Sequence, residues 1–239
     1  MIERQRLGGM AALAASATVV IGIAMYATAL TDYTAGDATP GESVAFLADH
    51  QATIYLWNLI TLIGFGLVVV PLALALYDRL RTESRGLAAT AAAFGLIWAG
   101  LLMAAGMILN IGSGVIVDLS RADPAGAESL WLTIDTVGNG LSGGMEIVGP
   151  IWVLLVSWAA LRAGAFPRAM NYVGGIIGVA GLFTIVPALE SVGMVFGLGL
   201  IVWLTWLGIV MLRSGHTPFT TGEDTPLTEG ERSAMTVGG

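Results

Sequence analysis

Residues 143–162 read GGMEIVGPIWVLLVSWAALR, an apolar run long enough to cross a membrane. A spanning α-helix needs about 20 predominantly apolar residues. Glu146 places a carboxylate near the start of this run, and Pro150, four residues later, has no N–H to bond the Glu146 carbonyl oxygen. A charge and an unpaired backbone group are both costly in lipid. The stretch therefore predicts a membrane helix with a polar site near its start.

The composition of the 239-residue chain fits a membrane protein, with 56% hydrophobic and 11% charged residues. Soluble domains average about 25% charged residues. The absence of cysteine and lysine excludes disulfides, thiolate metal sites and nucleophiles of either type. The histidines, His50 and His216, are too few for a bis-histidine haem or a poly-histidine metal site. We therefore predict no metal and no cofactor. The net charge of −7, without a basic cluster, argues against nucleic acid as a partner.

Six apolar stretches of this kind follow one another along the chain. The expected spans are 7–30, 52–77, 87–117, 143–162, 169–189 and 192–212. We predict an all-α fold, a polytopic transmembrane bundle of six helices forming one domain over 1–213. An extracytoplasmic amphipathic helix is expected over 127–142, and a disordered cytoplasmic tail over 214–239. Cleavage of 1–29 as a signal peptide is the alternative for the first span, although the run exceeds the usual apolar region of such peptides.

Shorter patterns predict local structure between and within the spans. Residues 39–42, Thr-Pro-Gly-Glu, have the spacing of a capping box with proline at the first helical position. Residues 78–86, DRLRTESRG, predict a short loop. Gly174 and Gly178 form a GxxxG pattern, which we interpret as helix packing inside the bundle, with a dimer interface as the alternative.

The arginines predict the orientation of the bundle. An even number of spans places both termini on one side of the membrane. The arginines that fall on that side are Arg4, Arg6, Arg79, Arg81, Arg85, Arg162, Arg168 and Arg213, whereas only Arg121 falls in an opposite loop. Because arginine accumulates in cytoplasmic loops, the N and C termini are predicted to be cytoplasmic and the protein to be a multi-pass plasma-membrane protein.

Polar residues gather at the extracytoplasmic ends of the predicted spans. Asp135, Asn139 and Glu146 recur on one helical face, because their spacing follows the helical repeat. Asn110 and Asn58 lie towards the same side of the membrane in the third and second spans. Polar groups at membrane depth usually face a cavity or pair with one another. We expect these five residues to line an outward-facing polar pocket.

A structural interpretation of the same residues stays open. Asn110 and Glu146 would then bond each other and hold two helices together, with Glu146 protonated at a site of low dielectric constant. Asn58 would form an interhelical hydrogen bond, and Asp135 would be an ordinary interfacial carboxylate. Both interpretations predict buried hydrogen bonds, but only the first predicts a cavity.

Residues 149–213 resemble a known family. The pattern consists of a tryptophan-rich span, an Arg-x-Gly-x-x-Pro-Arg turn from Arg162 to Arg168, a glycine-rich span ending at Pro187, and Phe-Gly-Leu at the start of the last span. It is similar to an uncharacterised family of six-helix prokaryotic membrane proteins, the domain of unknown function of the 4386 type. The resemblance implies an integral membrane protein of about this size, and it implies no activity and no functional residues.

The leading functional hypothesis is binding or sensing of a small hydrophobic or ionic ligand in the polar pocket. No catalytic residue is predicted, because the sequence has no GxSxG, HExxH or phosphate-binding motif. Two alternatives remain. An intramembrane enzyme would use Glu146 and Asp135 as an acid/base pair on a lipid or isoprenoid substrate. A small transporter would show paired discontinuous helices. Membrane lipids are the expected partners in every case.

Overall fold

The computed structural model describes residues 2–31, 38–142 and 147–213, and within these ranges the chain is helical, without a β-strand. The predicted site residue Glu146 and the predicted tail over 214–239 lie outside the described residues. The elements in chain order are α1 (Ile2–Met25), η1 (Tyr26–Leu30), α2 (Pro40–Asn58), η3 (Leu59–Gly64), α3 (Phe65–Ser120), α4 (Pro124–Ser142), α5 (Val148–Ala163), α6 (Arg168–Phe183), η4 (Pro187–Val192) and α7 (Gly193–Arg213).

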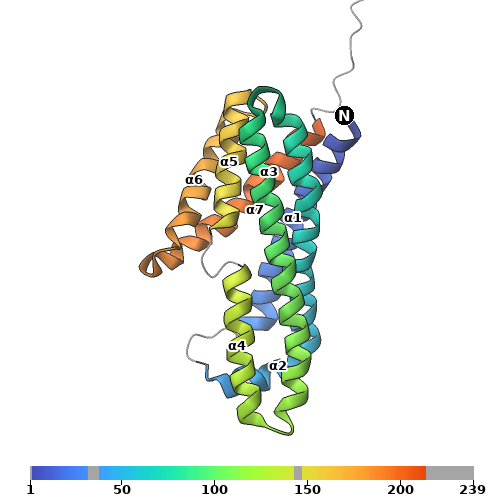
Figure 1. The fold of residues 1–239 in the computed structure, drawn as a ribbon, viewed down its shortest axis with the longest axis vertical. Helices are drawn as coiled ribbons and strands as arrows, with labels where there is room; N and C mark the ends of the chain where they lie inside the picture. Colours follow the sequence, from blue (N-terminus) through green and yellow to red (C-terminus); the bar gives the residue numbers. More distant parts are fainter. Residues whose placement is uncertain (1, 32–37, 143–146, 214–239) are drawn as a thin grey trace, which may run out of the picture.

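Two parts make up the elongated molecule (Figure 1). In the upper part, α1 packs against α3 and α7, α3 packs against α5, and α6 packs against α5 and α7. In the lower part, α4 packs against α2 and the lower end of α3. α3 extends through both parts and therefore connects them.

α3 is a helical hairpin rather than two helices joined by a loop. The predicted loop over 78–86 is wrong, because the residues there are helical apart from a break at Ser84, where φ is −149° and ψ is 66°. One residue outside the helical region is enough to reverse the chain, so the two arms of α3 lie antiparallel (Figure 1). The charged residues that suggested a loop are instead helical residues, most of them exposed, at this end of the bundle.

The start of α2 follows the predicted capping box. The Thr39 hydroxyl accepts a hydrogen bond from the Glu42 backbone N–H, and the Glu42 carboxylate accepts one from the Thr39 backbone N–H at 2.8 Å. Pro40 occupies the first helical position, where its missing N–H costs nothing. From Pro40 the chain continues through α2, η3 and α3, with His50 as a local departure from helical geometry. The capping prediction is confirmed.

Each part of the molecule has its own hydrophobic core. The lower core joins α2, α3 and α4 through residues such as Leu47, Ile54 and Ile116. The upper core contains an aromatic chain, which consists of Phe65, Trp98, Trp152 and Trp203 from α3, α5 and α7. Successive ring centroids are 5.1, 5.6 and 5.8 Å apart. Aromatic pairs at this spacing add to the stabilisation from buried area.

The glycine pair of the GxxxG pattern packs inside the bundle. A Cβ atom added at Gly174 would meet the Ser157 hydroxyl and lie 2.6 Å from Trp203 Nε1. One added at Gly178 would lie 2.6 Å from the Leu154 side chain of α5. These glycines therefore allow α6 to approach its neighbours closely, as the packing interpretation predicted.

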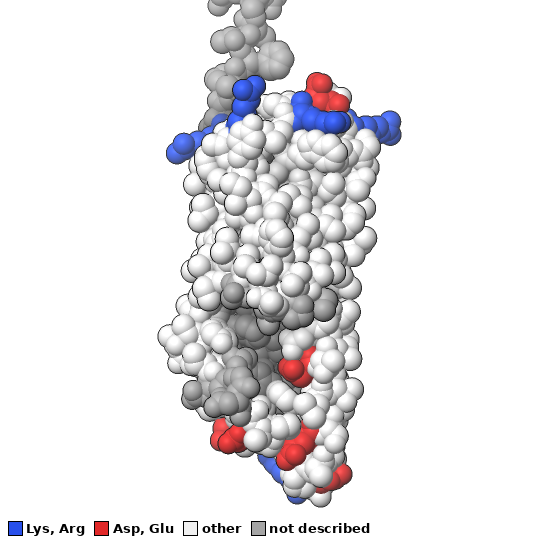
Figure 2. Space-filling model, turned by 90° about the vertical axis from the view of Figure 1, so that its left-hand side faces the viewer, with Lys and Arg blue, Asp and Glu red and all other residues white. Residues whose placement is uncertain are grey.

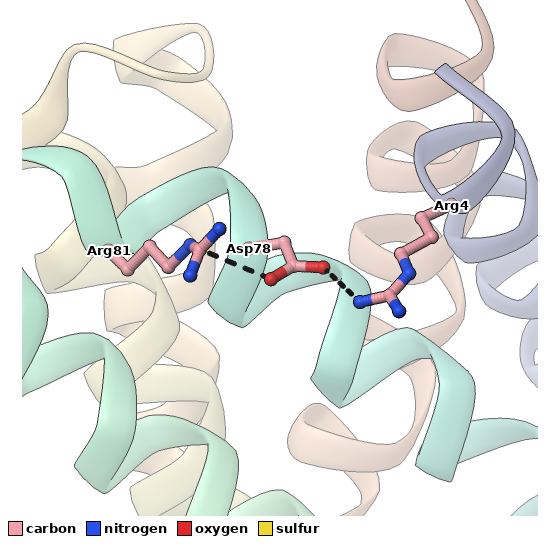
Figure 3. Close-up of polar contacts among 3 residues, drawn as sticks. All are labelled: Arg4, Asp78 and Arg81. Atoms are coloured by element: carbon pink, nitrogen blue, oxygen red, sulfur yellow. Dashed lines mark hydrogen bonds and ion pairs between the residues drawn. The ribbon is translucent and has the colours of Figure 1, made fainter. Parts of the chain in front are cut away.

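Charged residues are separated along the long axis of the molecule. Figure 2 shows most of the visible arginines at the upper end, carboxylates mainly towards the lower end and an uncharged surface between them. At the upper end Arg4 bonds Asp78 at 3.0 Å, and Arg81 lies 3.6 Å from the same carboxylate (Figure 3). The Arg4–Asp78 pair joins α1 to α3, whereas the Arg81–Asp78 pair lies within α3. Each exposed pair contributes up to about 1 kcal/mol.

Three helical segments are long and apolar enough to cross a membrane by length and composition: Glu3–Leu30, Pro40–Ser120 and Gly193–Arg213. Val148–Ala163 is a shorter apolar helix. Large apolar side chains also remain exposed on the surface, among them Ile111, Ile176 and Met194. An all-helical fold with apolar helices of membrane length is the architecture that positions the site.

Candidate functional site

A polar cavity of about 340 Å³ lies where α2 and η3 meet α3 and α4. Three of the five predicted site residues line it, namely Asn58, Asp135 and Asn139. They come from helices that are distant in sequence, and the packing of α4 against α2 and α3 brings them together. Other polar side chains of the lining are Ser43, Ser113 and Ser142.

Asn58, which lines the cavity, is hydrogen-bonded to Asn110, which does not. Asn58 Nδ2 donates to Asn110 Oδ1 at 3.1 Å, and both side chains are buried. Asn110 Nδ2 donates in turn to the Tyr55 carbonyl oxygen at 3.3 Å. The pair thus holds α2 to the second arm of α3, as the structural interpretation of Asn58 expected. Asn110 supports Asn58 through this hydrogen bond and makes no part of the cavity lining itself.

Replacing Asn110 by alanine should lower the stability of the protein. The substitution removes both hydrogen bonds and leaves the buried Asn58 amide without its partner. We expect a loss of about 1–3 kcal/mol in the free energy of unfolding, which thermal unfolding in detergent would measure. Asn139→Ala, at an exposed hydrogen bond, is the matched control and should change stability little. Equal losses in the two variants would contradict the structural role of the Asn58–Asn110 pair.

Asp135 and Asn139 lie one turn apart on α4. Asn139 Nδ2 donates to Asp135 Oδ2 at 2.9 Å. Burial raises the pKa of the Asp135 carboxyl above its usual range, and the hydrogen bond from Asn139 opposes that rise. The carboxyl group is thus half-buried at the edge of a cavity, and its Oδ1 forms no hydrogen bond with a described residue.

An apolar cavity of about 450 Å³ lies next to the polar one. It is lined by α1, η3, α3 and α7, through side chains such as Phe65, Trp98, Phe196 and Leu200. The two cavities share Tyr26, Trp57, Leu62 and Ser142 in their linings. The two cavities are thus neighbours, one with polar side chains towards the lower part and one apolar within the upper part, and we call them the joined cavities.

The residues shared by the two cavities are not among the site residues predicted from the sequence. One of them is Trp57, which lies at the end of α2 next to Asn58. Its ring nitrogen donates to the Gly22 carbonyl oxygen at 3.0 Å and links α2 to α1. The only pattern that pointed to Trp57 was the position of an aromatic residue one before Asn58 at the end of a span. Tyr26 and Phe196 gave no such indication.

The predicted pairing of Glu146 with Asn110 or Asp135 lies outside the described residues. Within the described ranges, no group of three or more His, Asp or Glu side chains is placed to hold a metal ion. The chemistry available in the described lining is therefore hydrogen bonding by amides and hydroxyls, one carboxylate, and a large apolar surface.

These features, apolar helices of membrane length around a hollow of mixed polarity, define an α-helical protein of the membrane type. The chain belongs to the family described as Domain of unknown function (DUF4386), which matches residues 7–215. The resemblance seen over residues 149–213 is thereby confirmed and extends to both parts of the molecule. No curated protein and no solved structure matches the chain.

Proposed function

We propose that this protein is a multi-pass plasma-membrane protein that binds an amphiphilic small molecule in the joined cavities. In this proposal both termini are cytoplasmic and the polar cavity opens towards the outer side. The clustering of arginines at one end of the molecule and of carboxylates towards the other supports that orientation (Figure 2). The function is binding or sensing, without catalysis.

One observation carries the proposal: the polar and apolar cavities share four lining residues. A small ion would use only the polar cavity and leave about 450 Å³ of apolar space unused. A purely apolar ligand would leave Asp135 and Asn139 without a role. A molecule with a polar head and an apolar chain matches both surfaces, and ligand sites of this size are usually apolar with a few orienting polar groups.

The chemistry of the lining favours a head group that donates hydrogen bonds or carries positive charge. Asp135 is the only charged side chain in the described lining of the polar cavity, and no arginine lines it. A carboxylate attracts an ammonium group and repels an anionic head. We therefore expect an alkyl amine to bind more tightly than a fatty acid of the same chain length.

Binding of tritiated hexadecylamine and tritiated hexadecanoic acid to the purified protein tests this expectation. The amine should bind and the acid should not. Asp135→Asn should weaken amine binding about 10- to 100-fold, because a charge-assisted hydrogen bond contributes about 1.5–3 kcal/mol. Amine binding should also strengthen as the pH rises through the raised pKa of Asp135, since only the ionised carboxyl attracts the ammonium group.

A second variant tests the apolar cavity. Gly197 lines it, and a Cβ atom added there would meet nothing within 4 Å. Gly197→Leu should therefore fill the cavity without disturbing the fold, and weaken amine binding at least about tenfold. Gly100→Leu is the matched control, because Gly100 also has open space but lies outside the cavity. Equal binding by both leucine variants, or preference for the acid, would refute the proposal.

A further inference from the structure

A groove on the surface of the upper part, away from the joined cavities, has a lining of its own. It lies between α5 and α6, has a volume of about 550 Å³ and is almost entirely apolar. Leu154, Trp158 and Leu161 form the α5 wall, and Tyr172, Ile176 and Val179 form the α6 wall. Trp158, Tyr172 and Ile176 are exposed, at 51%, 60% and 67% of their surface.

Each wall of this α5–α6 groove has an arginine at its upper end. Arg162 follows Trp158 by four residues on α5, and Arg168 precedes Tyr172 by four residues on α6. Residues four apart lie on one helical face, so both arginines continue the walls of the groove. The Arg162 guanidinium lies 4.9 Å from the centroid of the Trp158 ring, which holds it beside the groove.

No residue that the structure describes neutralises the charge of these arginines. Both side chains are exposed, and neither forms a salt bridge with any described residue. The sequence from Val148 to Phe183 contains no aspartate or glutamate. The upper end of the groove is therefore a site of positive charge directly above an apolar channel.

Two buried polar atoms lie among the groove residues. Ser157 and Asn171 contribute to the lining, and the Ser157 hydroxyl and Asn171 Oδ1 have no hydrogen-bond partner among the described residues. Both residues are almost fully buried, and the Ser157 hydroxyl lies against Gly174 of α6. Neither atom is open to a ligand in the groove, so the apolar walls and the arginines are the features that a ligand would contact.

We propose that the α5–α6 groove is a binding site for one anionic phospholipid, with its phosphate at Arg162 and Arg168 and an acyl chain between Trp158 and Tyr172. This site is separate from the joined cavities, and it rests only on the membrane-spanning part of the proposed function. Arginine pairs at the ends of membrane helices are suited to anionic head groups, because both charge and hydrogen-bond geometry match a phosphate.

Gly175 supplies a direct test, because it lines the groove and a Cβ atom added there would meet nothing within 4 Å. Native mass spectrometry of the full chain would measure bound phosphatidylglycerol and phosphatidylcholine. We expect one tightly bound phosphatidylglycerol and at least about tenfold less phosphatidylcholine. Gly175→Leu and the double variant Arg162→Gln/Arg168→Gln should each lose at least about tenfold of the phosphatidylglycerol occupancy, whereas Gly100→Leu should retain it.

Several outcomes would overturn the site. Equal occupancy by the two lipids would show that the charge of the head group does not determine binding. Retention of phosphatidylglycerol by Gly175→Leu would place the lipid elsewhere. Displacement of the lipid by excess inorganic phosphate, at an ionic strength matched with sodium chloride, would indicate a phosphate site without an acyl channel. Thermal unfolding of each variant shows whether the bundle is intact. Asp135→Asn should retain phosphatidylglycerol, so failure of the amine site and failure of this site are distinguishable.

Discussion

Gly174→Ala should lower the free energy of unfolding by about 2 kcal/mol, within the range that overpacking of a core costs. The added methyl group would meet the Ser157 hydroxyl and lie 2.6 Å from Trp203 Nε1, and the Trp203 side chain is completely buried. Ser157 can rotate away, but Trp203 packs against Trp152 and has no free space to enter. Close packing of α6 against α5 and α7 therefore depends on the missing side chain.

The neighbouring residue provides the matched control. A Cβ atom at Gly175 meets nothing within 4 Å, so Gly175→Ala should leave stability unchanged or slightly increased, since alanine favours the helix. Thermal unfolding in detergent compares the two variants. Ser157→Ala in the Gly174→Ala background should restore part of the loss, because it removes the oxygen nearest to the new methyl group. If the two alanine variants unfold alike, the packing of α6 differs from that described.

Single cysteines should react with a membrane-impermeant maleimide according to their position along the long axis. The chain has no cysteine, so each introduced thiol is the only target. In intact cells, Ala122→Cys at the lower end should react fully, and Glu83→Cys at the arginine-rich end should react only after permeabilisation. Ile176→Cys should stay unreactive until the protein is denatured, because the proposed hydrocarbon layer contains no water to ionise the thiol.

The opposite pattern would place both termini outside the cell and refute the orientation inferred from the arginines. Equal reaction of Glu83→Cys and Ala122→Cys in intact cells would show that the two ends of the molecule do not lie on opposite sides of a membrane. Both positions are exposed in the structure. Full labelling of Glu83→Cys and of Ala122→Cys after solubilisation in detergent confirms that the fold blocks neither of these two thiols.

Local features of this fold were predictable from sequence because they depend on neighbouring residues. The capping box at Thr39 and Glu42 needs only the correct residues three apart, and it was predicted correctly. The spacing of Asp135 and Asn139 on one helical face likewise follows from the helical repeat. The bend of α3 was predicted at about the right place, but as a loop. A single residue, Ser84, accomplishes the reversal, and nothing in its type distinguishes it from other serines.

The features that depend on tertiary packing were not predictable in the same way. The hydrogen bond between Asn110 and Asn58 could not be predicted from depth in the membrane alone, since the contact depends on how α2 lies against the second arm of α3. The apolar cavity is formed by residues such as Phe196 and Leu200. Side chains of these types are equally common in packed cores and on lipid-facing surfaces. Only their arrangement around empty space identifies them.

The aromatic chain through the upper core also gives this molecule an optical property. Trp98, Trp152 and Trp203 succeed one another at ring separations below 6 Å, on three different helices. Indoles this close, held at fixed angles of 43° and 85°, couple in their excited states. Near-ultraviolet circular dichroism depends on such fixed packing and is lost when tertiary structure loosens. The docking of α3, α5 and α7 can therefore be followed spectroscopically without attaching any label.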